Sequence, residues 1–153
     1  MAASTHAVGR ATSAYQALGP TNGGNVICQI VHHSLTANAS ANDVFQMIKV
    51  PNGAVAVGGW IAMDSTDAFT YQVGWGGDVD GFVPSSSVSA SQTMQNFVRD
   101  LSGAVTKLGH QFTADDTIDV KLTAITATVA VDWTLCVFYL APNDPQTGGI
   151  VSS

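Results

Sequence analysis

The stretch TIDVKLTAITATVA, Thr117–Ala130, carries the clearest fold signal in this chain. Every second side chain of an extended backbone points to the same side, so Ile118, Val120 and Leu122 are expected to lie together on one face. This alternation predicts a β-strand with one buried face. The run WTLCVFYLA, Trp133–Ala141, is apolar on both faces, which predicts a central strand packed on both sides.

Earlier parts of the chain repeat this strand pattern. Short runs rich in β-branched and aromatic residues are separated by turn signals at intervals of roughly 8–12 residues, which is typical of a β-sandwich or barrel. The sequence therefore predicts an all-β fold. The expected strands are Val26–Leu35, Asp43–Val50, Ala54–Met63 and Phe69–Gly74.

Asp43–Val50 gives a specific expectation about which side chains are buried. Simple alternation places Phe45, Met47 and Lys49 on one face. The same alternation places Val44, Ile48 and Val50 on the opposite face, together with Gln46.

Glycine, proline and serine residues predict turns, a bulge and a loop at several points of the chain. Pro51-Asn52-Gly53 predicts a turn, because proline fixes φ and glycine accepts positive φ. Gly58-Gly59 inside a strand predicts a bulge or a close backbone approach. The Ser-rich segment Pro84–Gln92 is expected to be a loop, whereas Thr93–Val98 fits either a strand or the start of a short helix over Thr93–Leu101.

The chain divides into an arm and a domain. Met1–Asn25 is rich in Ala, Ser, Thr and Gly without a sustained period, which predicts an extended N-terminal arm. Residues 26–153 are expected to form one β-sandwich or jelly-roll domain. The first 20 residues lack an apolar segment, so a secretory signal is not expected.

Composition excludes several classes of partner. Charged residues are 10% of the 153 residues, the net charge is −6, and all 11 acidic residues are aspartate. Arg and Lys are scattered, so the basic footprint that nucleic-acid binding needs is missing. No window of about 18 apolar residues exists, so no membrane span is expected. With so few charges, we expect part of the surface to be buried against partner chains.

The Gly/Asp-rich stretch Tyr71–Phe82, YQVGWGGDVDGF, looks at first like a ligand loop. Asp78 and Asp80 have the spacing of a calcium loop, but Val83 and Ser89 stand where such a loop needs Gly and Glu. A phosphate-binding loop needs a following Lys and Ser/Thr, which are absent. We therefore interpret the stretch as a turn at a corner of the sandwich.

No other set of residues predicts catalysis, a cofactor or a metal. His32 and His33 point to opposite faces of a strand. Cys28 and Cys136 are expected to be buried free thiols, with pairing in an oxidising compartment as the alternative. Asp115-Asp116 is expected to end a turn before a strand rather than to act as a pair of catalytic carboxylates. The sequence therefore predicts a protein that is not an enzyme, with no catalytic, cofactor-binding or metal-binding residue.

An alternative function rests on the aromatic residues. Trp60, Trp75 and Trp133, together with Tyr71, are candidates for a platform that stacks sugars. In that case the chain would be a glycan- or receptor-binding β-sandwich.

Three segments resemble the head decoration (cement) proteins of tailed bacteriophages. The likeness spans roughly Asp43 to Ala141 and departs from the family at Trp75 and in the long N-terminal arm. The matching residues are Pro51–Ala54, Val73–Gly74 with Gly77–Phe82, and Ala114–Val120.

The resemblance implies a β-sandwich or jelly-roll on the outside of an icosahedral head. It implies a homotrimer that binds the major capsid protein and bridges neighbouring capsomers, made in the host cytoplasm and located in the virion. No catalytic residue carries over from the family. For the alternative function, the resemblance implies a glycan- or receptor-binding domain of a phage head or tail fibre. A net charge of −6 fits an exterior position away from packaged DNA.

Overall fold

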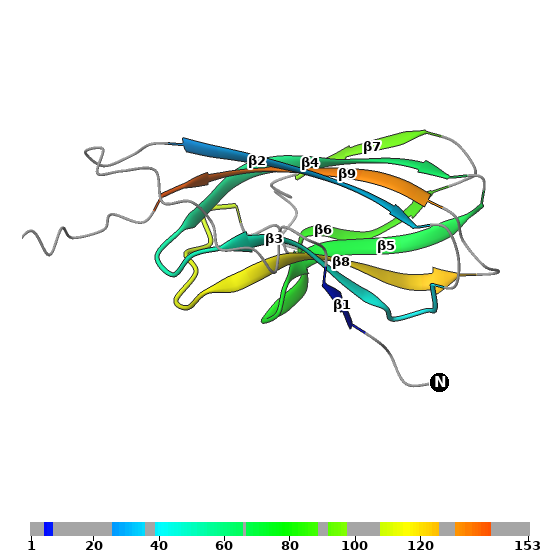
Figure 1. Cartoon of the computed structure of the whole chain (residues 1–153), viewed down its shortest axis with the longest axis horizontal. Coiled ribbons are helices and arrows are strands. Elements are labelled where there is room, and N and C mark those ends of the chain that lie inside the picture. The colour runs from blue at the N-terminus through cyan, green and yellow to red at the C-terminus, as the bar shows by residue number, and fades with distance from the viewer. Residues whose placement is uncertain are drawn as a thin grey trace, which may run out of the picture.

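A computed structural model describes residues 5–7, 26–35, 39–65, 67–88, 92–97, 108–125 and 131–141. These residues form strands and connecting turns, with no helix among them, and the strands pack as two facing layers (Figure 1). The strands are β1 (Thr5–Ala7), β2 (Val26–Leu35), β3 (Val44–Val50), β4 (Val55–Ser65), β5 (Phe69–Trp75), β6 (Asp78–Val88), β7 (Thr93–Asn96), β8 (Asp116–Ile125) and β9 (Val131–Leu140).

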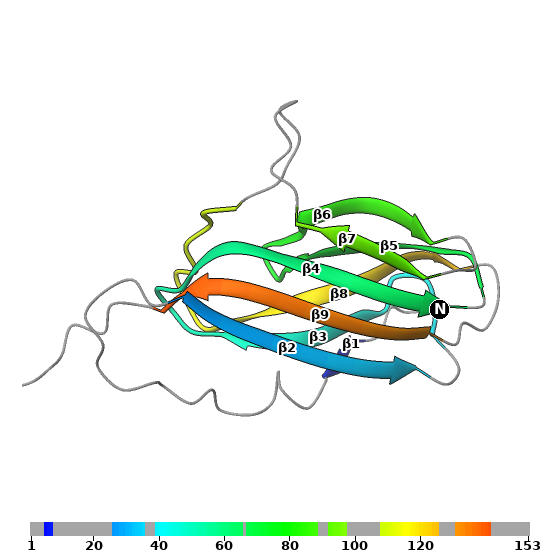
Figure 2. The same ribbon diagram turned by 90° about the horizontal axis from the view of Figure 1, so that it is seen from above.

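The strand order is that of a jelly roll. The four-stranded sheet has the order β2-β9-β4-β7, and the five-stranded sheet has the order β1-β3-β8-β5-β6 (Figure 2). Leaving out β1, the strands pair from the outside of the sequence inward: β2 with β9, β3 with β8, β4 with β7 and β5 with β6. All these pairs are antiparallel, as in a long hairpin rolled into two sheets. The predicted all-β sandwich or jelly-roll fold is confirmed.

Aromatic side chains join the two layers. Trp133 of β9 in the four-stranded sheet is fully buried and meets Phe45 of β3 in the five-stranded sheet edge-on, with ring centroids 4.8 Å apart. His33 of β2 lies between the sheets, 5.5 Å from Trp133 and 5.7 Å from Phe45 by ring centroids. Such tilted and edge-on contacts are the favoured geometries for aromatic pairs.

The clearest sequence pattern forms the centre of one sheet. Ile118, Val120 and Leu122 are fully buried on the inner face of β8, as predicted. The strand ends at Ile125, and residues 126–130 of the predicted run lie outside the described residues. The second pattern, Trp133–Ala141, forms the central strand β9 as expected.

The predicted alternation in β3 is wrong, because the strand contains a bulge. The register with β8 shifts between Gln46 and Ile48, so Met47 is the extra residue. A bulge reverses which side chains face inward beyond it. Consequently Phe45, Met47, Ile48 and Val50 are all buried, while Lys49 is turned outward.

One turn prediction and one bulge prediction are confirmed, and one loop prediction is not. Gly53 has φ +84°, and the N–H of Ala54 donates to the carbonyl of Pro51 at 3.1 Å, which closes the predicted turn. A register shift precedes Gly58, as its sequence suggested. The first part of the Ser-rich segment, Pro84–Val88, belongs to β6 and is not a loop, since its last three residues, Ser86–Val88, pair with β5.

The predicted arm is only partly described. Thr5–Ala7 forms β1, which runs parallel to β3 at the edge of the five-stranded sheet. The rest of the arm lies outside the described residues, as do 98–101 of the short helix considered at Thr93–Leu101. Thr93–Asn96 is a strand.

Candidate interaction surface

The outer side of the four-stranded sheet is apolar. Among the described residues, the four large hydrophobic side chains that are more than a third exposed all lie there: Val26 (57%), Ile30 (51%), Val57 (39%) and Met94 (64%). They come from β2, β4 and β7. We call this surface the apolar face and define it by Val26, Cys28, Ile30, Val57, Trp60, Met94, Cys136, Phe138 and Leu140.

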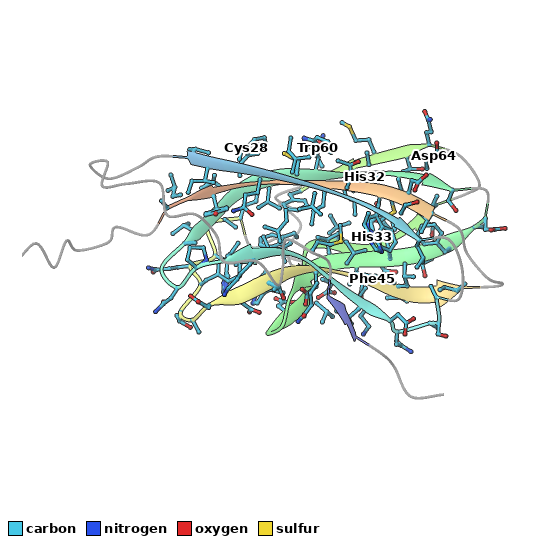
Figure 3. The ribbon with its side chains drawn as sticks, viewed as in Figure 1. Cys28, His32, His33, Phe45, Trp60 and Asp64 are labelled. Atoms are coloured by element: carbon cyan, nitrogen blue, oxygen red, sulfur yellow. The ribbon has the colours of Figure 1, made fainter. Side chains whose placement is uncertain are left out.

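The centre of the apolar face is closely packed. Phe138 of β9 lies over Gly58 of β4, and a methyl group added at Gly58 would sit 3.6 Å from the Phe138 ring. Trp60 pairs in register with Cys136 and is half-buried. Figure 3 shows Trp60 and Cys28 along this outer side, while Phe45 points into the space between the sheets.

One end of the apolar face is polar. A shallow depression of about 440 Å³ is lined by His32, Thr134, Asp132, Asp64 and Met94, among others. His32 Nδ1 lies 3.2 Å from the Thr134 hydroxyl, and the side-chain amide of Gln92 donates to Asp64 at 3.1 Å. Asp64 and Asp132 are register neighbours on β4 and β9. The two ends of the apolar face therefore differ: one is acidic, at Asp64 and Asp132, and the other is apolar, at Val26 and Leu140.

The outer side of the five-stranded sheet is polar by comparison. Its hydroxyl groups pair across strands: the Thr70 and Thr123 oxygens are 2.7 Å apart. We call this surface the polar face and define it by Gln46, Lys49, Thr70, Gln72, Lys121 and Thr123. A polar side of this kind needs no partner to be stable in water.

Asp119 is an exception within the polar face. It lies on β8 between Gln46 and Gly74 in the register, it is 6% exposed, and its Oδ1 has no hydrogen-bond partner among the described residues. Burial raises the pKa of Asp119 to about 7; a hydrogen bond with Thr117 opposes this rise, and the charge of Asp116 adds to it. A buried carboxylate with one oxygen left without a hydrogen bond is costly, so folding favours the protonated form of Asp119.

The four edge strands differ in how they are protected. β1 has three residues, β7 has four, and β6 carries Pro84 and irregular pairing with β5. Short strands, proline and bulges are the usual means of blocking edge-to-edge pairing. β2 is ten residues long, pairs with β9 without a register shift, and contains neither proline nor Lys, Arg, Asp or Glu. Within the described residues its second edge is open, next to the apolar face.

The stretch Tyr71–Phe82 is a hairpin inside one sheet. β5 and β6 are joined at Gly76-Gly77, and the register jumps from Val73–Val83 to Trp75–Asp78, so residues of β6 bulge outward. The backbone of this bulge covers Gly74, where any side chain would meet the Asp78 carbonyl. The predicted role as a turn is supported, although the turn stays within one sheet rather than forming a corner between two.

Trp75 fills the space beneath this bulge. It lies against Gly81, stacks on His110 with ring centroids 4.0 Å apart, and contacts Phe82 at 5.0 Å. Trp75, Trp133 and Tyr71 are all buried, so these three cannot form a sugar-stacking platform with Trp60. The aromatic platform expected under the alternative function is therefore not present.

The structure also places the histidines, Asp115 and the two cysteines that the sequence analysis considered. His32 and His33 do point to opposite faces, and Asp115 accepts the Asn52 N–H at 2.9 Å and lies 3.9 Å from Lys49 Nζ. The expectation for the thiols is half wrong, because Cys136 is buried but Cys28 is exposed. Their sulfurs are 3.6 Å apart.

Two general findings concern the described part of the chain. No three His, Cys, Asp or Glu side chains in it are grouped so that they could hold a metal ion. It also contains no helix with the length and hydrophobicity to cross a membrane.

Comparison with known proteins places the fold among phage capsid structures. No family model and no curated protein sequence matches the chain. A chain from the capsid of Ralstonia phage GP4 superposes with a TM-score of 0.69 and 18% identity, over 90% of this chain and 97% of that one. A chain from the capsid asymmetric unit of cyanophage Pam1 gives 0.58 and 19%, over 86% and 96%. At these identities the likeness shows a shared fold that spans nearly the whole length of each neighbour.

Proposed function

We propose that this chain is a virion structural protein that decorates the exterior of a bacteriophage capsid and stabilises it by bridging neighbouring capsomers. The observation that carries the proposal is the apolar face. Stable monomers rarely leave a contiguous apolar surface uncovered, and such a surface commonly marks a protein–protein contact. The shared fold with chains from two phage capsids supports a virion as the place where the contact is made.

The apolar face is the surface that binds the major capsid protein. Its centre, around Trp60 and Phe138, offers large aromatic area, which is the kind of residue that contributes most to binding at interfaces. Its rim at Asp64, Asp132 and His32 is polar, as expected where an interface meets solvent. The net charge of −6 supports an exterior position.

Two finer parts of the proposal concern assembly. The subunit acts as a homotrimer, and residues 1–25 serve as an arm that reaches a neighbouring capsomer while 26–153 form the domain. Deleting residues 1–24 removes β1 but leaves the eight strands that pair from the outside inward. The truncated protein is expected to keep its fold and to bind heads more weakly.

Co-sedimentation with empty phage heads tests the proposal. The variant Ile30→Glu/Met94→Glu adds two charges to the apolar face and is expected to lose at least about tenfold in head affinity. The control Gln72→Glu/Ser87→Glu adds the same charge to the outer side of the five-stranded sheet and is expected to bind like the wild type.

The outcome that contradicts the proposal is equally definite. A wild-type protein that stays monomeric and does not sediment with heads would remove it. Equal weakening by both double variants would show that added charge, and not the apolar face, controls attachment.

A further inference from the structure

Cys28 and Cys136 are two neighbouring free thiols on β2 and β9, the first and last strands of the jelly roll. Cys28 lies on the edge strand β2 and Cys136 on the central strand β9, and both point to the outer side of the four-stranded sheet. They are 108 positions apart in the sequence, yet their sulfurs are only 3.6 Å apart. The first-with-last pairing of the jelly roll brings them together.

The register defines the geometry of the pair. Cys28 is opposite Phe138, and Cys136 is opposite Ile30, so the two cysteines are diagonal neighbours across the ladder. The right-handed twist of a sheet brings side chains closer along one of the two diagonals. The short distance between the sulfurs shows that the cysteines lie on that diagonal. A disulfide bond is about 2.05 Å long, so small side-chain rotations that bring the sulfurs closer by roughly 1.5 Å are needed to form it.

The two thiols differ in their access to solvent. Cys28 is exposed, whereas Cys136 is 1% exposed beneath its neighbours on the apolar face. Burial, together with the nearby Cys28 thiol, raises the pKa of Cys136 to about 11. An exposed thiol is the one that an external oxidant reaches first. The pair therefore has an entry residue, Cys28, and a resolving residue, Cys136.

We propose that Cys28 and Cys136 are a redox modification site, which a low-molecular-weight disulfide such as oxidised glutathione converts into an intramolecular disulfide that fastens β2 to β9. The Cys28 thiolate attacks one sulfur of glutathione disulfide, and the first glutathione leaves as a thiolate. The Cys136 thiol then loses its proton to solvent and attacks the Cys28 sulfur, and the second glutathione leaves. The two cysteines are oxidised by two electrons, and the glutathione disulfide is reduced to two thiols.

The bond would act on the open edge of the molecule. Within the described residues the backbone of β2 is hydrogen-bonded to β9 alone, so its place in the sheet depends on a single neighbouring strand together with side-chain packing at Val31 and His33. A covalent link that closes a loop of this length restricts the unfolded chain strongly. The pair is reduced in a reducing cytoplasm and oxidised outside it.

Oxidation of the purified full-length chain tests the site. The protein is equilibrated with reduced and oxidised glutathione, quenched with an alkylating reagent and weighed by mass spectrometry. The expected mass is that of a single chain that has lost both reactive thiols, with a peptide pair joined through Cys28 and Cys136. The Tm is expected to be higher by roughly 5–15 °C than that of the reduced protein. In Cys28→Ser and in Cys136→Ser, the redox-dependent difference in Tm is expected to vanish.

A matched control separates access from geometry. The variant Cys28→Ser/Ile30→Cys places a thiol directly opposite Cys136 in the ladder. If this variant closes a disulfide and the wild type keeps two free thiols, the diagonal pair cannot be bonded and the proposal is overturned. Oxidation of the wild type only to dimers that disappear in Cys28→Ser overturns it as well.

One extension rests on the proposed function. Because the pair lies within the apolar face, binding to heads is expected to slow its oxidation at least about tenfold compared with the free subunit. Unchanged oxidation on heads, with normal oxidation of the free subunit, would count against the apolar face as the docking surface and leave the thiol pair established.

Discussion

The two outer faces of this jelly roll differ in the polarity of the side chains that they expose to solvent. The polar face has hydroxyl, amide and amine groups, and its Thr70 and Thr123 oxygens pair across strands at 2.7 Å. The apolar face leaves Val26, Ile30 and Met94 more than half exposed. Both faces belong to sheets whose inner sides pack on one shared core. The difference teaches that the core accounts for folding, whereas the apolar face is the surface to which the proposed contact with another molecule is assigned.

The largest expected effect separates the core from the apolar face. Leu135→Ala on the inner side of β9 removes a fully buried side chain and is expected to lower the free energy of unfolding by about 2–5 kcal/mol. Met94 is 64% exposed, so Met94→Ala is expected to change the free energy of unfolding by less than about 0.5 kcal/mol. Urea unfolding of both variants provides the measurement. A Met94→Ala cost as large as that of Leu135→Ala would make the apolar face part of the core.

The next effect concerns two neighbouring glycines of β4, of which one allows a close approach of β9 and Phe97. Gly59→Ala in β4 would place a methyl group 2.5 Å from the Cys136 carbonyl oxygen and against the Phe97 ring, so we expect a loss of about 1–3 kcal/mol. Gly58→Ala meets only the Phe138 ring at 3.6 Å and is expected to be close to neutral. Thermal unfolding of the two neighbouring variants distinguishes them, and equal losses would contradict the close approach at Gly59.

Asp119, on the strand that carries Lys121 and Thr123 of the polar face, is expected to make the free energy of unfolding depend on pH. Its pKa is raised from 3.8 to about 7 in the folded chain, so the folded state binds a proton more tightly than the unfolded state between these values. The free energy of unfolding is therefore expected to fall as pH rises through this window, by at most about 1.4 kcal/mol per pH unit. Asp119→Asn should flatten this slope. Asp132→Asn, an exposed change beside the apolar face, is the control, and the same flattening in both would exclude Asp119 as the cause.

The smallest expected effect is at the Lys49–Asp115 ion pair beside the polar face. The two groups are 3.9 Å apart and both partly exposed, so solvent screens their attraction. Lys49→Met is expected to change stability by less than about 1 kcal/mol and to leave head binding unchanged. A large loss of head binding would mean that the polar face also takes part in docking.

Much of the fold could be predicted from the sequence because alternation records which side chains share a face. Ile118, Val120 and Leu122 are buried together as expected, and the glycine at 53 turns the chain. The bulge at Met47 was missed, since nothing in DVFQMIKV distinguishes an extra residue from a regular one. The Ser-rich composition of Pro84–Gln92 predicts a loop, but Ser86 and Ser87 are paired with β5, because strand pairing is decided by a partner that the local composition does not contain.

The candidate surface was harder to predict for a physical reason. Apolar residues on both faces of WTLCVFYLA indicate that both faces avoid water, but they do not say what covers the outer one. In the described residues the inner face of β9 packs on the core, and the outer face forms the middle of the apolar face. The thiol pair depends on a register between strands 108 residues apart, which no local pattern contains.

The pairing of β2 with β9 has a consequence for the topology of the chain. Val26 and Leu140 are register partners, so the first and last strands of the roll meet at one end of the four-stranded sheet. The order of strands is thus nearly circular. A short linker from Leu140 to Val26, with new termini cut between Gly76 and Gly77, would permute the sequence while every pair of strands in the roll kept its neighbour.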